Sequence, residues 1–303
     1  MTAIKSATLP SPRWTDLPER GTPLILRVFH WIAITCGRAT ARVLLYPINL
    51  YFVIGARTAR RVSYQYLRRI LGRRVHWRDV FRHFHCFAST ILDRVYLLRG
   101  EFSRFNVTVH GADILHRNME TGQGCILLGS HLGSFEVLRT LGLTKRFQLK
   151  VLMNVEHNEN LTRFLDSLNP DVADTVIVPD RPDTLLRIRE NLDRGFLIGT
   201  LGDRVTENDK TTSCHFLGAP ATFPAGPMII SALMHRPIVL FFGLYRGGNR
   251  YEIHFEHFAD EILLNRERRT EQLQQWTQCY ADRLEHYTRM APYNWFNFYP
   301  FWS

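Results

Sequence analysis

The stretch "CILLGSHLGSFEVLR", residues 125–139, joins a short apolar run to a glycine-flanked turn that carries a histidine. The apolar run Cys125–Gly129 predicts a buried strand, and the pattern that opens at Phe135 predicts a helix. In a hydrolase elbow the centre of such a glycine frame is a serine, but here it is His131. Because active residues of open α/β sheets follow the carboxyl ends of strands, this stretch predicts an α/β fold with a functional histidine.

The pattern continues on both sides of this stretch. Alternating or apolar runs predict further strands at 105–111, 149–154, 174–179, 196–204, 237–246 and 250–258. Helical patterns lie between or after them at 159–168, 183–195, 226–236 and 267–290. Such alternation predicts an α/β fold, with a mainly parallel or mixed central sheet flanked by helices. We expect residues 105–303 to form one continuous catalytic region.

The first 104 residues differ in charge from the rest. They hold 17 Arg and one Lys against five acids, a formal charge of +13, whereas the whole chain carries +10. The apolar segment 24–56 is interrupted by arginines, and its longest uncharged run, 43–56, is shorter than the roughly 20 residues that a spanning helix needs. The residues before this segment are predicted to form a polar leader. The apolar segment, the basic helical stretch 57–74 and a second helix at 78–99 together predict a helical region associated with an anionic membrane.

Two other interpretations of this N-terminal third remain open. The apolar segment could be a buried helical hairpin broken at Gly37 or Pro47, and the basic helix could simply present a solvated face. The five cysteines are scattered, without C-x-x-C spacing, which argues against a disulfide framework or a zinc site.

Glu136 follows His131 by five residues, in the first turn of the predicted helix, where the helix dipole favours a carboxylate. If the turn folds back, this carboxylate can orient one ring nitrogen of His131 and leave the other to take a proton. The pair would act as general base and orienter, and the nucleophile would be a substrate hydroxyl or amine. Alternatives are an ordinary surface or core histidine, or a hydrolase that uses Ser130. The His-Glu-x-x-His spacing of zinc proteases is absent.

The segment "GSHLGSFE" (129–136) resembles the His-x4-Asp/Glu signature of the lysophospholipid acyltransferase superfamily, and its bacterial lipid A late acyltransferase branch in particular. Four further blocks resemble elements of that branch in order and spacing: "LGDR" (201–204), "FLGAPATFPAGP" (216–227), "RPIVLFFG" (236–243) and "APYNWFNFYPFW" (291–302). The segment 243–260 resembles proteins associated with aryl-polyene and related pigment pathways.

This resemblance implies an acyltransferase that uses acyl carrier protein or coenzyme A thioester as co-substrate, with a lipid or glycolipid acceptor and no other cofactor or metal. In that role His131 deprotonates the acceptor and Glu136 stabilises the imidazolium. Arg204 and backbone N–H groups near Gly129 and Gly133 are candidates for stabilising the oxyanion. Asp203 is expected to position Arg204, although an ion pair that only closes the strand end is the alternative.

Two further segments are expected to line the cleft. Gly218, Pro220 and Gly226 belong to a predicted rigid turn before a helix start, where an acceptor phosphate or carboxylate could bind. Asn154 follows another strand end. Either segment could instead be an ordinary loop.

The resemblance places the enzyme on the cytoplasmic face of the bacterial inner membrane, attached peripherally or partly inserted. Two other functions are kept as alternatives. One is an acyl-thioesterase on the same fold, which would release free fatty acid. The other is a basic nucleic-acid-binding protein, which the charge of the N-terminal third allows but for which no recognition motif is present.

Overall fold

The computed structural model describes residues 31–120, 122–141, 148–153, 175–179, 181–206 and 209–302. The helix expected at 159–168 and the candidate Asn154 lie outside these residues.

A seven-stranded mixed sheet forms the centre of the molecule, in the order β1-β9-β8-β2-β5-β3-β4. Strands β8, β2, β5, β3 and β4 pair in parallel, whereas β9 is antiparallel to β8 and parallel to the edge strand β1. This confirms the expected α/β fold. The bounds are β1 Asn106–His110, β2 Ile126–Gly129, β3 Leu149–Leu152, β4 Val176–Ile177, β5 Leu197–Leu201, β8 Ile238–Tyr245 and β9 Arg250–Ala259.

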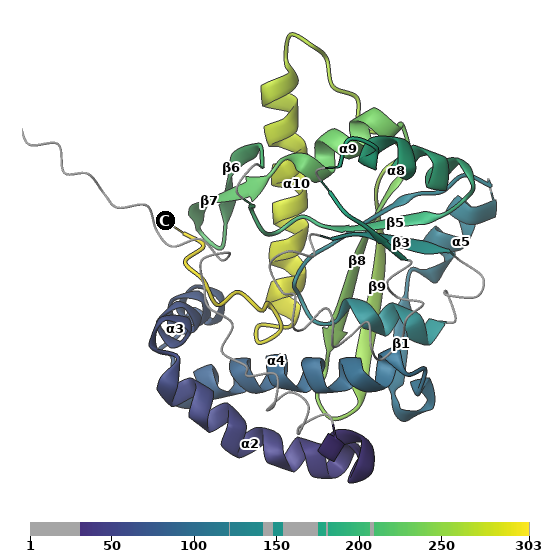
Figure 1. Cartoon of the computed structure of the whole chain (residues 1–303). Helices are drawn as coiled ribbons and strands as arrows, with labels where there is room; N and C mark the ends of the chain where they lie inside the picture. Colours follow the sequence, from purple (N-terminus) through teal and green to yellow (C-terminus); the bar gives the residue numbers. More distant parts are fainter. Residues whose placement is uncertain are drawn as a thin grey trace, which may run out of the picture.

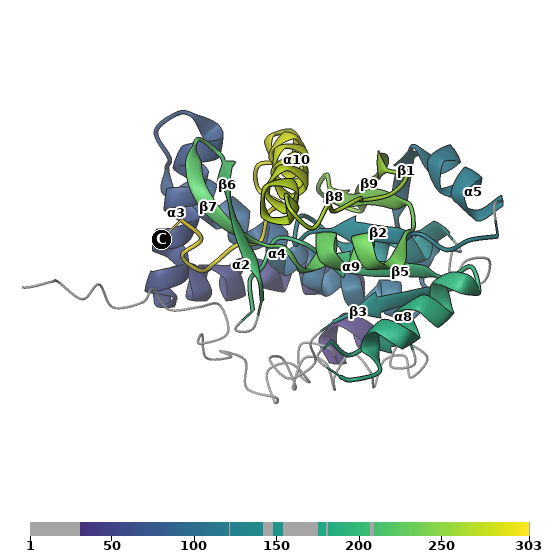
Figure 2. The ribbon, with the colours of Figure 1, turned by 90° about the horizontal axis from the view of Figure 1, so that it is seen from above.

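Helices cover both faces of the sheet (Figures 1 and 2). The side chains of β8 alternate, so that Leu240 and Phe242 belong to one hydrophobic core and Val239 and Phe241 to the other. The first core includes residues of α8 (Thr184–Asp193), α9 (Gly226–Met234) and α10 (Arg269–Met290). The second includes residues of α2 (Gly37–Gly55), α4 (Trp77–Leu98), α5 (Ala112–Glu120) and the 3-10 helix η3 (Phe135–Leu141).

Two elements differ from the sequence-based expectation. The helix after the His131 turn is the 3-10 helix η3 rather than an α-helix. The predicted rigid turn at 218–227 is wrong for most of its length, because residues 219–224 form β7 (Ala219–Pro224) and pair antiparallel with β6 (Thr211–Phe216). Leu217 and Gly218 join these strands with positive φ angles, as a two-residue hairpin turn requires.

The described part of the N-terminal region, from residue 31 onward, is mainly helical, as expected, whereas the predicted leader lies outside the described residues. Pro47 lies inside α2 and does not end it, and α2 is followed by α3 (Arg57–Leu71) at an angle of 95°. No single helix of the described residues has the length and hydropathy of a membrane span, although α2 and α3 meet those criteria together as a bent pair. Because α2 and α4 contribute to the second core of the sheet, they are packed parts of the fold. The domain boundary after residue 104 stays a prediction.

Candidate active site

The site lies where two neighbouring parallel strands end. Gly129 at the end of β2 is in register with Leu201 at the end of β5. His131 follows β2 by two residues, and Asp203 follows β5 by two residues. Since the carboxyl ends of parallel strands meet at one edge of the sheet, equal offsets from paired strand ends bring these two side chains together.

The carboxylate of Asp203 is bound by three donors. Its Oδ1 lies 2.8 Å from Nδ1 of His131, and both oxygens accept from the backbone N–H of His131, at 3.1 and 3.0 Å. The indole Nε1 of Trp295 donates to Oδ2 at 2.9 Å. Asp203 is 1 % exposed and Trp295 is equally buried, so the carboxylate is held rigidly against the imidazole.

Burial and charge set the protonation of this pair. Burial is the main cause that lowers the pKa of His131, followed by the charge of Arg204, while Asp203 opposes both. Burial alone would raise the pKa of Asp203, but His131 and Arg204 outweigh it and hold that pKa below its ordinary value. At neutral pH the site therefore contains a carboxylate and a neutral imidazole. With Nδ1–H donating to Asp203, the lone pair lies on Nε2.

Glu136 does not occupy the orienting position that the sequence analysis gave it. Its carboxylate lies 2.5 Å from Nε of Arg94 in α4 and accepts a long hydrogen bond from Ser134, at 3.4 Å. The physical reason is the path of the turn: the N–H of Ser134 bonds the carbonyl of Gly243 in β8, which directs η3 along the sheet towards α4. The contact to His131 is made instead by Asp203.

Among the described residues, the hydrogen bonds of Asp203 are to His131 and Trp295, and the charges of Asp203 and Arg204 attract each other. That Asp203 positions Arg204 stays a prediction. Arg204 donates to the carbonyl of Phe296 at 3.0 Å and lies over the ring of Tyr299 at 6.0 Å. Burial lowers its pKa, with Asp203 opposing. Arg204 and Arg94 are both close enough for their charges to lower the pKa of His131.

The glycines of the turn are explained by packing. A Cβ on Gly133, whose φ is +77°, would lie 1.9 Å from the carbonyl oxygen of Gly243. The N–H of Gly133 itself donates to the carbonyl of Asn294. Whether other N–H groups near Gly129 and Gly133 stabilise an oxyanion stays a prediction. A Cβ on Gly129 would lie 3.3 Å from Leu201 and from the carbonyl of Phe241.

The candidates of the 216–227 segment lie in the β6–β7 hairpin and at the start of α9. Gly218 is in the hairpin turn, Pro220 pairs with His215, and Gly226 begins α9. The hairpin reaches the site through Phe216, whose ring centroid lies 5.1 Å from that of Trp295. Whether these residues bind substrate stays a prediction.

Sequence reasoning missed the roles of Trp295 and Arg94. Trp295 belongs to the C-terminal segment, which lies across the site: its neighbour Phe296 donates its N–H to the carbonyl of His131. The carbonyl of Trp295 is in turn 2.8 Å from Nε2 of the buried His83. Trp295 stood in a quoted motif, but no local signal links it to Asp203. Arg94 lies on a helix 42 residues before Glu136.

The arrangement can perform base catalysis on a substrate hydroxyl or amine, with two cations beside the base. A family model described as bacterial lipid A biosynthesis acyltransferase matches residues 21–303 of the chain. No curated protein matches it significantly.

Proposed function

Because the chain belongs to the family of bacterial lipid A biosynthesis acyltransferases, we propose that it transfers a fatty acyl group from a thioester to a hydroxyl or amine of a lipid-like acceptor. The observation that carries the assignment of the base is the 2.8 Å contact between Nδ1 of His131 and Asp203. A carboxylate in this position fixes the tautomer in which Nε2 accepts a proton.

In the proposed mechanism, Nε2 of His131 takes the proton of the acceptor group as its oxygen or nitrogen attacks the thioester carbonyl. Asp203 stabilises the imidazolium that forms. The tetrahedral intermediate collapses and expels the thiolate, which receives the proton from His131. The products are an ester or amide and the free thiol, and the histidine returns to its neutral form.

We assign the developing oxyanion to the cations beside His131. Arg204 carries a partly buried guanidinium, and a positive charge in a partly desolvated site stabilises a developing anion. Arg94 lies on α4, and its ion pair with Glu136 of η3 fixes its position. Glu136, the second residue of the His-x4-Glu motif, thus acts through Arg94 in this proposal.

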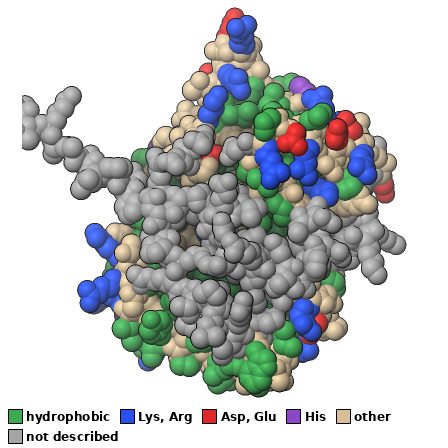
Figure 3. All heavy atoms as spheres, in the orientation of Figure 1, with side chains coloured by type: hydrophobic (Ala, Val, Ile, Leu, Met, Phe, Trp, Pro, Cys, Tyr) green, Lys and Arg blue, Asp and Glu red, His purple; other side chains and the backbone are tan. Residues whose placement is uncertain are grey.

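The proposed donor is an acyl carrier protein or coenzyme A thioester, and the proposed acceptor is a lipid or glycolipid. The surface supports work at a membrane. α2 exposes Val43, Tyr46, Leu50 and Ile54 along one side, and α3 carries exposed arginines next to it. Hydrophobic side chains gather along the lower edge of the face in Figure 3, where α2 lies. We propose attachment to the cytoplasmic face of the inner membrane.

The direct test is a transfer assay with purified protein, radiolabelled acyl carrier protein or coenzyme A thioesters, and a total lipid extract as acceptor. Label that moves into a lipid product only in the presence of the extract supports the proposal. Release of free fatty acid at the same rate with and without acceptor would instead support the thioesterase alternative. Absence of both products with every donor would contradict acyl-group chemistry.

A further inference from the structure

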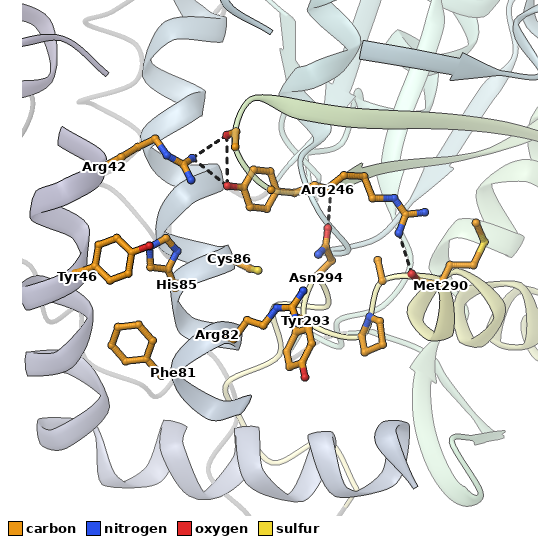
Figure 4. A pocket seen from close by; sticks show the side chains of 15 residues that line it. Arg42, Tyr46, Phe81, Arg82, His85, Cys86, Arg246, Met290, Tyr293 and Asn294 are labelled. Atoms are coloured by element: carbon orange, nitrogen blue, oxygen red, sulfur yellow. Dashed lines mark hydrogen bonds between the residues drawn. The ribbon is translucent and has the colours of Figure 1, made fainter. Parts of the chain in front are cut away.

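A pocket of about 430 Å³ lies between α2, α4, the β8–β9 turn and the C-terminal segment, with its lining residues seen in Figure 4. Asn294 connects it to the site already described: its side-chain oxygen accepts from the N–H of Tyr245, and its carbonyl accepts from Gly133. The pocket lining contains neither His131 nor Asp203. The mechanism above uses none of its side chains.

The lining is strongly cationic. It includes Arg42, Arg82 and Arg246, and among the described residues that line it none is Asp or Glu. Arg42 donates to neutral oxygens, the hydroxyl of Tyr245 and the carbonyl of Gly248, so these contacts leave its charge uncompensated. Arg82 lies over the ring of Tyr293, with 4.3 Å between its guanidinium carbon and the ring centroid.

Arg246 forms an ion pair with Glu252 at 2.7 Å. Among the described contacts, no carboxylate pairs with Arg42 or Arg82. His85 adds a polar atom to the same wall: its Nε2 is buried and has no hydrogen-bond partner among the described residues. An unpartnered buried nitrogen beside two uncompensated guanidinium groups is an arrangement that an anion with several acceptor oxygens would satisfy.

The pocket shares one lining residue, Tyr46, with an exposed apolar stripe of α2. Val43, Tyr46, Leu50 and Ile54 recur at helical spacing on α2 and are 67, 56, 46 and 62 % exposed. Tyr46 belongs both to this stripe and to the pocket lining. A ligand that has an anionic group in the pocket can therefore lay an apolar part along α2.

We propose that this pocket binds the phosphate headgroup of an anionic phospholipid whose acyl chains lie along the α2 stripe. The phosphate oxygens accept hydrogen bonds from Arg42 and Arg82. Bidentate pairing of guanidinium with phosphate is strong and favours phosphate over neutral headgroups. This assignment assumes only that the protein meets a membrane, and it does not depend on acyl transfer.

The test is calorimetric titration of the full-length protein with short-chain, soluble probes below their micellar concentrations. We expect dihexanoyl phosphatidic acid to bind at least tenfold more tightly than inorganic phosphate, because its chains bury apolar surface. It should also bind at least tenfold more tightly than dihexanoyl phosphatidylcholine, whose headgroup has no net charge. Arg82→Gln should weaken phosphatidic acid binding at least tenfold. The matched control is Arg78→Gln, because Arg78 is exposed on the same helix and lies outside the pocket.

Each of the following results would overturn the proposal. Equal binding of the two lipids would show that the cations do not select the headgroup. Binding of inorganic phosphate or coenzyme A as tight as that of phosphatidic acid would assign the pocket to a soluble phosphate compound. Equal effects of Arg82→Gln and Arg78→Gln, or no binding at all, would remove the pocket as a site. Because the readout is binding, these results are independent of whether acyl transfer is observed.

Discussion

Nδ1 of His131 lies 2.8 Å from Oδ1 of Asp203, although 72 residues separate the two in the chain. The pairing of β2 with β5 produces this contact, since each residue follows its strand by two positions. It replaces the local pairing of His131 with Glu136 that the motif suggests. Two carboxylates, Asp203 and Glu136, and two cations, Arg204 and Arg94, therefore surround the base.

Substitutions around His131 should move the acid limb of the pH–rate profile in opposite directions. Asp203 raises the pKa of His131, so in Asp203→Asn the residual activity should persist to lower pH than in the wild type. Arg204 lowers that pKa, so Arg204→Gln should move the limb to higher pH. The measurement is kcat/KM between pH 4.5 and 8, which reports the free enzyme. Shifts of the same sign in both variants would contradict the electrostatic assignment.

Glu136 and Arg94 should behave as one unit. Glu136→Gln leaves the Arg94 charge uncompensated near His131, and Arg94→Gln removes the cation itself. We expect each single variant to lose about tenfold or more in kcat/KM, and the double variant to lose little beyond the worse single one. A double variant whose loss equals the product of the single losses would show that the residues act independently.

His83 should make the fold sensitive to acid. Burial lowers its pKa from 6.5 to about 4, opposed by the carbonyl of Trp295. Below pH 6.5 His83 is therefore protonated in the unfolded chain, but in the folded chain it stays neutral until about pH 4. The free energy of unfolding falls as the pH is lowered across this interval. The pKa difference of His83 between the unfolded and the folded chain corresponds to a loss of roughly 3 kcal/mol in the free energy of unfolding.

Urea unfolding at pH 7 and pH 4.5 measures this loss. His83→Gln should be less stable than the wild type at pH 7, by about 1–3 kcal/mol, because Ser63 and Trp295 lose their buried partner. It should also lose less stability between the two pH values than the wild type does. Equal losses in both proteins would exclude His83 as the group responsible.

The exposed arginines of α3 should bind anionic membranes. Arg57, Arg61 and Arg68 lie on one face of the helix, whereas Arg60, Arg69 and Arg73 have contacts within the fold. Replacing the first three by Gln should lower the affinity for phosphatidylglycerol vesicles, measured by flotation, by about 100-fold, because each charge contributes roughly 1 kcal/mol to binding. Binding to neutral vesicles should change little. An unchanged affinity for anionic vesicles would contradict this surface.

Much of the fold follows from local patterns. The apolar runs of β2 and β8 and the stop of α8 near Gly195 are set by neighbours in the chain, and the structure has them within a few residues of the expected positions. The β6–β7 hairpin was missed because β7 contains two prolines, Pro220 and Pro224, which are uncommon inside strands. In the site, His131 was found from its place after a strand. The same rule applies to Asp203, but only the strand order shows that the two strands are neighbours.

The acyl-transfer rate of Asp203→Asn tests the central claim most directly. The variant should be folded, as judged by near-ultraviolet circular dichroism, because Asn keeps the shape of the buried side chain. With the wrong tautomer of His131 favoured and its imidazolium no longer stabilised, single-turnover transfer should fall by roughly 10²–10⁴. A folded Asp203→Asn protein that transfers acyl groups within about threefold of the wild-type rate would contradict the assignment of His131 and Asp203 as base and orienter.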